Sequence, residues 1–181
     1  IEVNLKPIIQ DERKQTTVII ALLEMKIEMK LQPEILIFQH SSILTSDLLE
    51  AFFYPSLERL DLCYCEKIDN KVVSIIQSQC PNLKALSLAG CIGVREITGS
   101  FFNLEDLDVS HCSNLHTLKL KAHSLQNLKG SHNLLLQEVK LGSDVVKTAS
   151  SQVDITRPPS FGKKEWAEYF GDIGIEPPLP Q

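Results

Sequence analysis

The 181-residue chain has no excess of positive charge and no long apolar run. Its 18 Lys and Arg against 23 Asp and Glu give a net charge of −5, whereas nucleic-acid-binding domains normally carry a basic face, so no nucleic-acid partner is predicted. It contains no apolar stretch as long as a bilayer-spanning helix, so no membrane partner is predicted. A signal-peptide pattern is also missing, and because the chain opens on Ile1 we expect a fragment or a processed chain.

The sequence also lacks the short motifs that mark catalytic and nucleotide-binding sites. It contains neither G-x-S-x-G nor G-x-x-x-x-G-K-[ST], and neither G-x-G-x-x-G nor H-E-x-x-H. With 43% apolar and 23% charged residues, the chain can nevertheless bury a core. We therefore predict a folded protein that is not an enzyme and uses no cofactor. Its oligomeric state is left open.

The five cysteines do not form a zinc-ligand pattern. Cys63 and Cys65 are separated by one residue, which is tighter than the usual spacer of zinc ligands, and no second pair follows. An odd number of cysteines without a secretion signal indicates free thiols in a reducing compartment, so we expect a cytoplasmic protein.

A repeat runs through the middle of the chain. The motif Leu57-x-x-Leu60-x-Leu62-x-x-Cys65 recurs with its leucines at 83, 86 and 88, then at 104 and 107, and in weaker copies that start at 33 and 125. Each L-x-L predicts a short strand whose alternate residues face a shared core. The spacing of 24 and 26 residues in the first two repeats leaves room for a helix on the return, whereas the later spacing of 21 predicts extended returns.

This pattern resembles the cysteine-containing leucine-rich repeats of F-box-associated substrate receptors. The segments YPSLERLDL (54–62) and CPNLKALSLAGC (80–91) carry the resemblance. It implies an α/β fold, namely a leucine-rich-repeat solenoid (horseshoe) of about five coils over residues 33–145. It also implies a protein-binding role, such as substrate recognition for a ubiquitin-ligase-type assembly.

The ninth position of each repeat is predicted to be a buried structural position, where a side chain satisfies backbone groups. This ladder comprises Ser41, Cys65, Cys91, Cys112 and Asn133. The preceding position holds His111 and His132 in neighbouring repeats, which places them about 5 Å apart. We interpret both as residues at the end of a strand rather than as metal ligands.

Outward-facing strand residues form the candidate partner-binding surface on the concave face. They comprise Glu58, Arg59, Asp61, Lys84, Ser87, Glu105, Asp106, Asp108 and Lys129. Because acidic residues dominate on the strand that holds Asp106 and Asp108, a protein or peptide with a basic segment is the expected partner. The alternative interpretation is a solvated polar surface without a ligand.

The flanks divide into three segments. Residues 1–32 are predicted to form an N-terminal cap or incomplete repeat, with a strand where apolar residues alternate over 23–31. Residues 146–160 are a predicted linker, and residues 161–181 a short helix with a Pro-rich tail. The tail resembles that of leucine-rich-repeat proteins from obligate intracellular bacteria, which implies an effector in the host cytosol. An alternative function is a scaffold whose tail recruits a Pro-binding partner.

Overall fold

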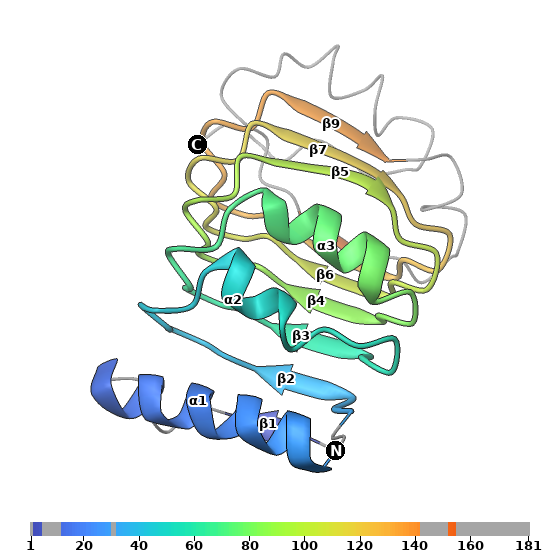
Figure 1. Ribbon diagram of the computed structural model, residues 1–181. Helices are drawn as coiled ribbons and strands as arrows, with labels where there is room; N and C mark the ends of the chain where they lie inside the picture. Colours follow the sequence, from blue (N-terminus) through green and yellow to red (C-terminus); the bar gives the residue numbers. More distant parts are fainter. Residues whose placement is uncertain (1, 5–11, 30–31, 142–151, 155–181) are drawn as a thin grey trace.

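The computed structural model describes residues 2–4, 12–29, 32–141 and 152–154. Within them lie two parallel sheets and three helices (Figure 1). The larger sheet has seven strands, in the order β1 (Glu2–Asn4), β2 (Ile35–Ile37), β3 (Arg59–Asp61), β4 (Ala85–Ser87), β6 (Asp106–Asp108), β8 (Asn127–Lys129) and β10 (Gln152–Asp154). The smaller sheet has three: β5 (Glu96–Ser100), β7 (Thr117–Lys121) and β9 (Glu138–Leu141). The helices are α1 (Glu12–Met29), α2 (Ser46–Glu50) and α3 (Lys71–Gln79).

A row of leucines at the middle of successive strands sets the register of the larger sheet. Leu36 pairs with Leu60, Leu60 with Leu86, Leu86 with Leu107, and Leu107 with Leu128. All five are at most 3% exposed. Since strand residues alternate between the two faces, the residues on either side of each leucine point away from the core. Slipping one strand by one residue would expose its leucine, so the register is strongly specified.

The return segments form the opposite side of the core. In Figure 1, α2, α3 and the three-stranded sheet lie on one side of the molecule and the seven-stranded sheet on the other. The returns β5, β7 and β9 pair in register through Ile97, Leu118 and Val139. These three side chains are buried against the same core as the leucine row.

The fold class predicted from the sequence is therefore corrected. A leucine-rich-repeat solenoid in the form of a horseshoe is not the architecture; the structure is an α/β fold with a seven-stranded and a three-stranded parallel sheet and few helices. A horseshoe needs one side wider than the other. In β5, β7 and β9 the returns are themselves hydrogen-bonded strands, with the same spacing of about 4.8 Å as the larger sheet. Over these repeats neither side is wider than the other, so the width difference that a horseshoe needs is missing.

The N-terminal segment contains a second correction. The apolar alternation over 23–31 predicts a strand, but α1 continues to Met29. Leu, Glu, Met and Lys are strong helix formers, and this preference outweighs the alternation. The helix buries Ile19 and Gln15, and the Gln15 Oε1 accepts a hydrogen bond of 3.1 Å from the Ser41 hydroxyl.

The predicted C-terminal segments are described only in part. Strand β10 lies inside the predicted linker 146–160 and pairs with β8. The predicted helix and Pro-rich tail over 161–181 lie outside the described residues.

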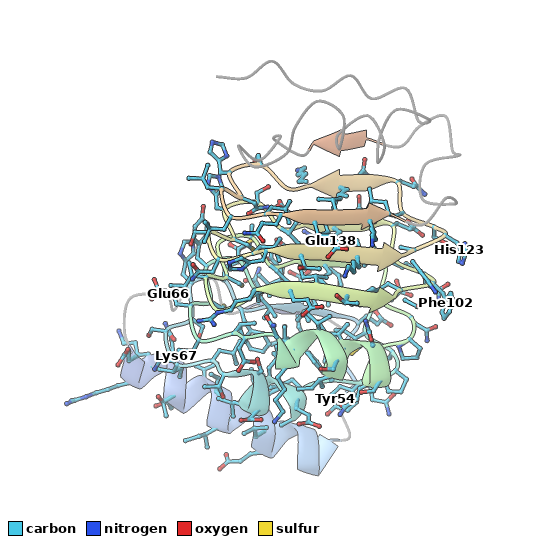
Figure 2. All side chains as sticks on the ribbon, turned by 90° about the horizontal axis from the view of Figure 1, so that it is seen from above. Tyr54, Glu66, Lys67, Phe102, His123 and Glu138 are labelled. Carbon is cyan, nitrogen blue, oxygen red and sulfur yellow. The ribbon has the colours of Figure 1, made fainter. Side chains whose placement is uncertain are left out.

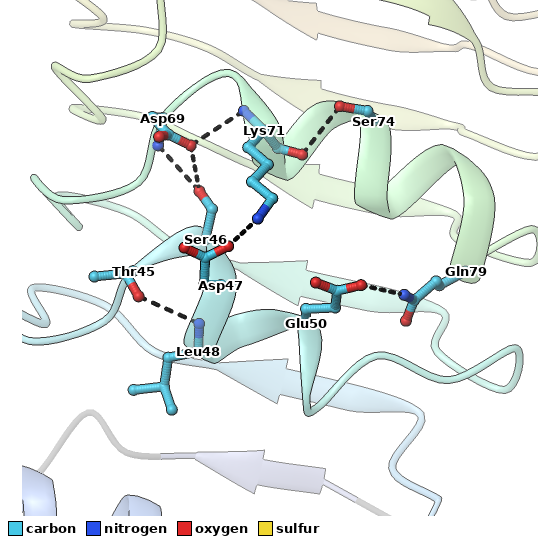
Figure 3. A network of polar contacts seen from close by, with 9 residues as sticks. All are labelled: Thr45, Ser46, Asp47, Leu48, Glu50, Asp69, Lys71, Ser74 and Gln79. Atoms are coloured by element: carbon cyan, nitrogen blue, oxygen red, sulfur yellow. Dashed lines mark hydrogen bonds and ion pairs between the residues drawn. The ribbon is translucent and has the colours of Figure 1, made fainter.

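A polar network joins α2 to α3 (Figure 3). Thr45 caps α2, because its Oγ1 accepts from the Leu48 N–H at 3.2 Å. Ser46 instead donates to the Asp69 carboxylate at 2.7 Å, and the same carboxylate accepts from the Lys71 N–H at 3.1 Å. The Lys71 ammonium also contacts the Asp47 carboxylate, so two return helices that lie side by side are held by their first turns.

Candidate functional site

The outer face of the seven-stranded sheet is hollowed along β4. Outward positions on this strand and just after it hold only small side chains, Ala85, Ser87 and Ala89. The strands on both sides carry longer ones, so they form two walls above a low floor. The resulting β4 groove has a volume of about 370 Å³. It is lined by Arg59, Leu60, Asp61, Cys63, Ala85, Leu86, Ser87, Asp106, Leu107, Asp108, Asn127 and Lys129.

Six of the nine predicted partner-binding residues line this groove. They are Arg59, Asp61, Ser87, Asp106, Asp108 and Lys129. The other three, Glu58, Lys84 and Glu105, precede their strands and are not part of the lining. Glu58 and Lys84 pair with each other at 3.0 Å, with side chains about half exposed.

Sequence reasoning missed three polar or small lining residues, Cys63, Ala85 and Asn127. The signal for them was present in the outward positions of the strands. A strand whose outward side chains are all small, lying between two strands with longer side chains, predicts a groove.

Asp61 is the most buried charged residue of the groove. Its side chain is 6% exposed, and its Oδ1 accepts from the Cys63 N–H at 3.1 Å. The Oδ2 accepts from the Gln39 side-chain amide at 2.5 Å. These bonds hold the carboxylate in place, but no Lys or Arg among the described residues forms an ion pair with it. The groove therefore contains a buried carboxylate that forms no ion pair with the cations of its own lining.

Asp106 and Asp108 form the opposite wall. The Asp108 Oδ1 accepts from the Ser110 N–H at 3.0 Å. The same bond, from the N–H two residues further along the chain, is made by Cys63 to Asp61. Asp106 accepts from the Asn127 side-chain amide at 2.5 Å. In the register of the sheet Asp61, Ser87 and Asp108 lie in one row across three strands, with Lys129 next in the row. Ser87 thus separates two carboxylates.

The Cys63 thiol closes the floor between β3 and β4. Its sulfur lies 2.9 Å from the Ser87 hydroxyl oxygen. Burial raises the pKa of this thiol from 9.0 to about 11, and the neighbouring Asp61 carboxylate adds to the increase. The thiol is therefore protonated at neutral pH and is a weak nucleophile.

The predicted ladder residues lie under the turns that follow the strands. Cys65, Cys91 and Cys112 are fully buried, and their thiols donate to the carbonyls of Phe38, Leu62 and Leu88 at 2.9 to 3.1 Å. Asn133 donates to the Val109 carbonyl at 3.0 Å. The Ser41 hydroxyl bonds to Gln15 of α1 instead of to a neighbouring carbonyl. Each sulfur or amide thus joins the turn of one repeat to the end of the strand in the repeat before it.

Burial also controls the chemistry of these thiols. It raises the pKa of Cys65 and Cys112 to about 12, that of Cys80 to about 11, and that of Cys91 further still. A backbone hydrogen bond lowers each of them by a smaller amount. These thiols are structural groups.

A column of rings and one glycine borders the groove where the strands end. Its members all have positive φ: His40 (55°), Tyr64 (56°), Gly90 (72°), His111 (58°) and His132 (62°). His40 stacks on Tyr64 with ring centroids 4.8 Å apart. His111 stacks on His132 at 4.4 Å, which confirms the separation of about 5 Å expected from the repeat.

The outer face of the three-stranded sheet differs in charge from the groove. Glu138, which is labelled in Figure 2, lies on this face, and it pairs with both Lys119 and Lys140, at 2.8 and 2.9 Å. The hydrogen bonds from Lys119 and then from Lys140 lower the pKa of Glu138. At the end of this sheet Phe102, 64% exposed, stacks on His123 with a centroid separation of 6.1 Å. The ion pairs of Glu138 neutralise part of the charge on this face, and the hollow that Glu96 and Thr98 share with α3 is smaller than the β4 groove, at about 170 Å³.

In the described part of the chain, no three His, Cys, Asp or Glu side chains are grouped as a metal site. None of the described helices is both long and apolar enough to cross a membrane.

No protein-family model matches the chain, and no curated protein matches its sequence significantly.

Proposed function

We propose that this chain is a non-enzymatic protein-interaction module that binds an extended segment of a partner protein in the β4 groove. The observation that carries this proposal is the hollow itself, which is framed by fixed side chains on rigid strands. Rigid walls reduce the conformational entropy that binding has to remove. Substrate recognition for a ubiquitin-ligase-type assembly, or the role of an effector in a host, would be special cases and rest on the sequence resemblance alone.

The chemistry of the groove supports binding rather than catalysis. Cys63 is its only thiol, and burial raises the pKa of Cys63 to about 11, far above that of an activated nucleophile. Its hydrogen-bond partner is a serine hydroxyl and not a histidine. The carboxylates in the lining differ from each other in burial, but they are engaged by N–H donors that orient them as binding groups.

We also propose a reducing compartment, the cytoplasm or the cytosol of a host, as the place of action. All five cysteines are free in the structure. Four of them are buried in the core of a protein whose turns they support, so oxidation would require the turns to open.

The test is a selection of short displayed peptides against the folded chain. Peptides selected on the natural chain are measured against Ser87→Trp, in which an indole fills the floor of the groove, and against Ser78→Trp on α3 as a matched control. Ser78 lies on the opposite side of the core and bonds only within its helix, at 3.0 Å. We expect Ser87→Trp to abolish binding and Ser78→Trp to preserve it. Peptides that bind all three proteins equally would refute the proposal.

A further inference from the structure

We propose that the β4 groove recognises a single arginine side chain, whose guanidinium lies over Ser87 between the carboxylates of Asp61 and Asp108. This inference rests on the proposed function, because it identifies the chemical group that the interaction surface takes. Three observations carry it: the buried Asp61 carboxylate that forms no ion pair, the row of residues across the strands, and the two cations at the corners of the groove.

The charge of Asp61 calls for a cation. The carboxylate is 6% exposed and lines the hollow, yet its hydrogen-bond donors are the neutral Gln39 amide and the Cys63 N–H. In the described part of the chain no cationic side chain lies within ion-pair distance of it. A buried carboxylate is stable when it is both hydrogen-bonded and paired with a cation, and only the first condition is met here.

The spacing of the row selects the shape of that cation. Asp61, Ser87 and Asp108 occupy adjacent strands in register, so the two acidic residues lie two strand spacings, or about 9.6 Å, apart. An ammonium group makes hydrogen bonds of about 2.8 Å from one nitrogen and reaches only one of them. A divalent metal ion requires oxygens at about 2.0 to 2.6 Å and fits the distance less well still. A guanidinium donates from opposite edges of a planar fork, so it is the widest of these donors and can bond to both carboxylates where they lean over Ser87.

The floor suits the rest of the side chain. Ala85 precedes Ser87 by two residues on β4 and presents only a methyl group to the groove, and the next outward position after Ser87 is the equally small Ala89. An arginine stem can lie along these methyl groups while the head lies over the serine. The Ser87 hydroxyl already contacts the Cys63 sulfur at 2.9 Å and keeps an oxygen lone pair for a guanidinium N–H.

The corners of the groove limit the number of basic residues. Lys129 is next to Asp108 in the row, and Arg59 precedes Asp61 by two residues on β3. Both line the hollow, so additional cations of a polybasic segment would be repelled. The groove therefore favours one arginine among neutral or acidic neighbours and is not a general acceptor of positive charge.

The experiment is a titration of the isotope-labelled chain with four blocked peptides, followed through the amide signals of β3, β4 and β6. The peptides are Gly-Ser-Arg-Ser-Gly, its lysine and citrulline analogues, and Gly-Arg-Arg-Arg-Gly. We expect the arginine peptide to bind at least about tenfold more tightly than the lysine peptide, and the citrulline peptide to leave the signals unchanged. The triple-arginine peptide should bind no more tightly than the single one.

Two charge-neutralising variants, one on β6 and one just before it, complete the test. Asp108→Asn removes one carboxylate of the row, whereas Glu105→Gln removes the same charge just outside the groove lining. Asp108→Asn should weaken the arginine peptide by at least about tenfold and Glu105→Gln by less than about twofold. Equal binding of the arginine and lysine peptides, a response to Glu105→Gln as large as that to Asp108→Asn, affinity that rises with peptide charge, or no shift with any peptide would overturn the inference.

The selection on displayed peptides separates this inference from the proposed function. If the selected peptides lose binding with Ser87→Trp but show no preference for arginine, the groove binds a partner and the arginine assignment is wrong. If Ser87→Trp weakens the binding of none of the selected peptides, both the proposed function and the arginine assignment are wrong.

Discussion

The ring of Tyr64 lies over Gly90, so close that a Cβ built on this glycine would be 2.3 Å from the ring carbon Cδ1. The other face of the ring stacks on His40 at a centroid distance of 4.8 Å. Four non-glycine residues at equivalent turns adopt positive φ, namely His40, Tyr64, His111 and His132. The left-handed conformation is therefore tolerated in this column, and it is the neighbouring ring that requires glycine at position 90.

Gly90→Ala tests this relationship. We expect a loss of about 1 to 3 kcal/mol in the free energy of unfolding, because the methyl group displaces the Tyr64 ring from its stack and adds backbone strain. In a Tyr64→Ala background the same substitution should cost about 1 kcal/mol or less, since only the backbone term remains. Urea denaturation of the four proteins of this cycle gives the coupling. Equal costs in the two backgrounds would show that Tyr64 is irrelevant to the glycine.

The ladder cysteine of β4 provides a second prediction. Cys91 is fully buried, and its thiol donates to the Leu62 carbonyl at 3.1 Å. Cys91→Ala should lower the free energy of unfolding by about 1 to 3 kcal/mol, because a small cavity opens and the Leu62 carbonyl keeps only one of its two donors, the Cys65 N–H. Cys91→Ser keeps a donor at the same place and should be the more stable of the two. Thermal and urea unfolding rank the variants, and a serine variant less stable than the alanine one would contradict the role of the bond.

Thiol reactivity gives the third prediction. Burial raises the pKa of Cys63 to about 11, so at pH 8 its thiolate fraction is about 100-fold smaller than that of a thiol with a pKa of 9.0. In the folded protein we expect Cys63, the one half-buried cysteine, to react slowly with a disulfide reagent, and the four buried ones only on unfolding. The Cys63→Ser variant identifies the slow phase. Rapid modification of Cys65, Cys91 or Cys112 at pH 8 would contradict their placement.

Alkaline pH provides the fourth prediction. The pKa values of these cysteines are higher in the folded protein than their ordinary value of 9.0, so the unfolded chain releases protons first as the pH rises. Their contribution to stability is complete below pH 9 and is lost as the pH rises through 11 to 12. The urea concentration at the midpoint of unfolding should therefore decrease as the pH is raised from 8.5 to 10.5, and it should decrease less steeply in Cys112→Ser. An unchanged midpoint over this range would show that the thiols ionise equally in both states.

The sequence contains enough to identify the inward-facing residues of the larger sheet. Leu60, Leu86 and Leu107 recur at one position of a repeat, and since strand side chains alternate in direction, the outward neighbours follow from the same pattern. The stacking of His111 on His132 follows from adjacent copies of one turn. Most of the groove lining could also be predicted from the sequence, because its walls and its floor of small residues lie at these outward positions.

Other features depend on contacts between segments that periodicity does not relate. Residues 23–29 have a strand pattern but lie in α1, because local helix preference overrides a weak alternation. The bond from Gln39 to Asp61, like the placement of Tyr64 over Gly90, joins side chains of different turns through their rotamers. A repeat template contains no information on such rotamers.

The fold class is the clearest example of a feature that the periodicity of the sequence does not determine. A repeat specifies, within each unit, which side chains are buried, since alternation and spacing are properties of a single chain segment. It does not specify what successive returns do to one another. Whether β5, β7 and β9 remain separate turns or pair into a second sheet depends on hydrogen bonds between units about 21 residues apart, and the three-dimensional packing of Ile97, Leu118 and Val139 against the shared core settles it.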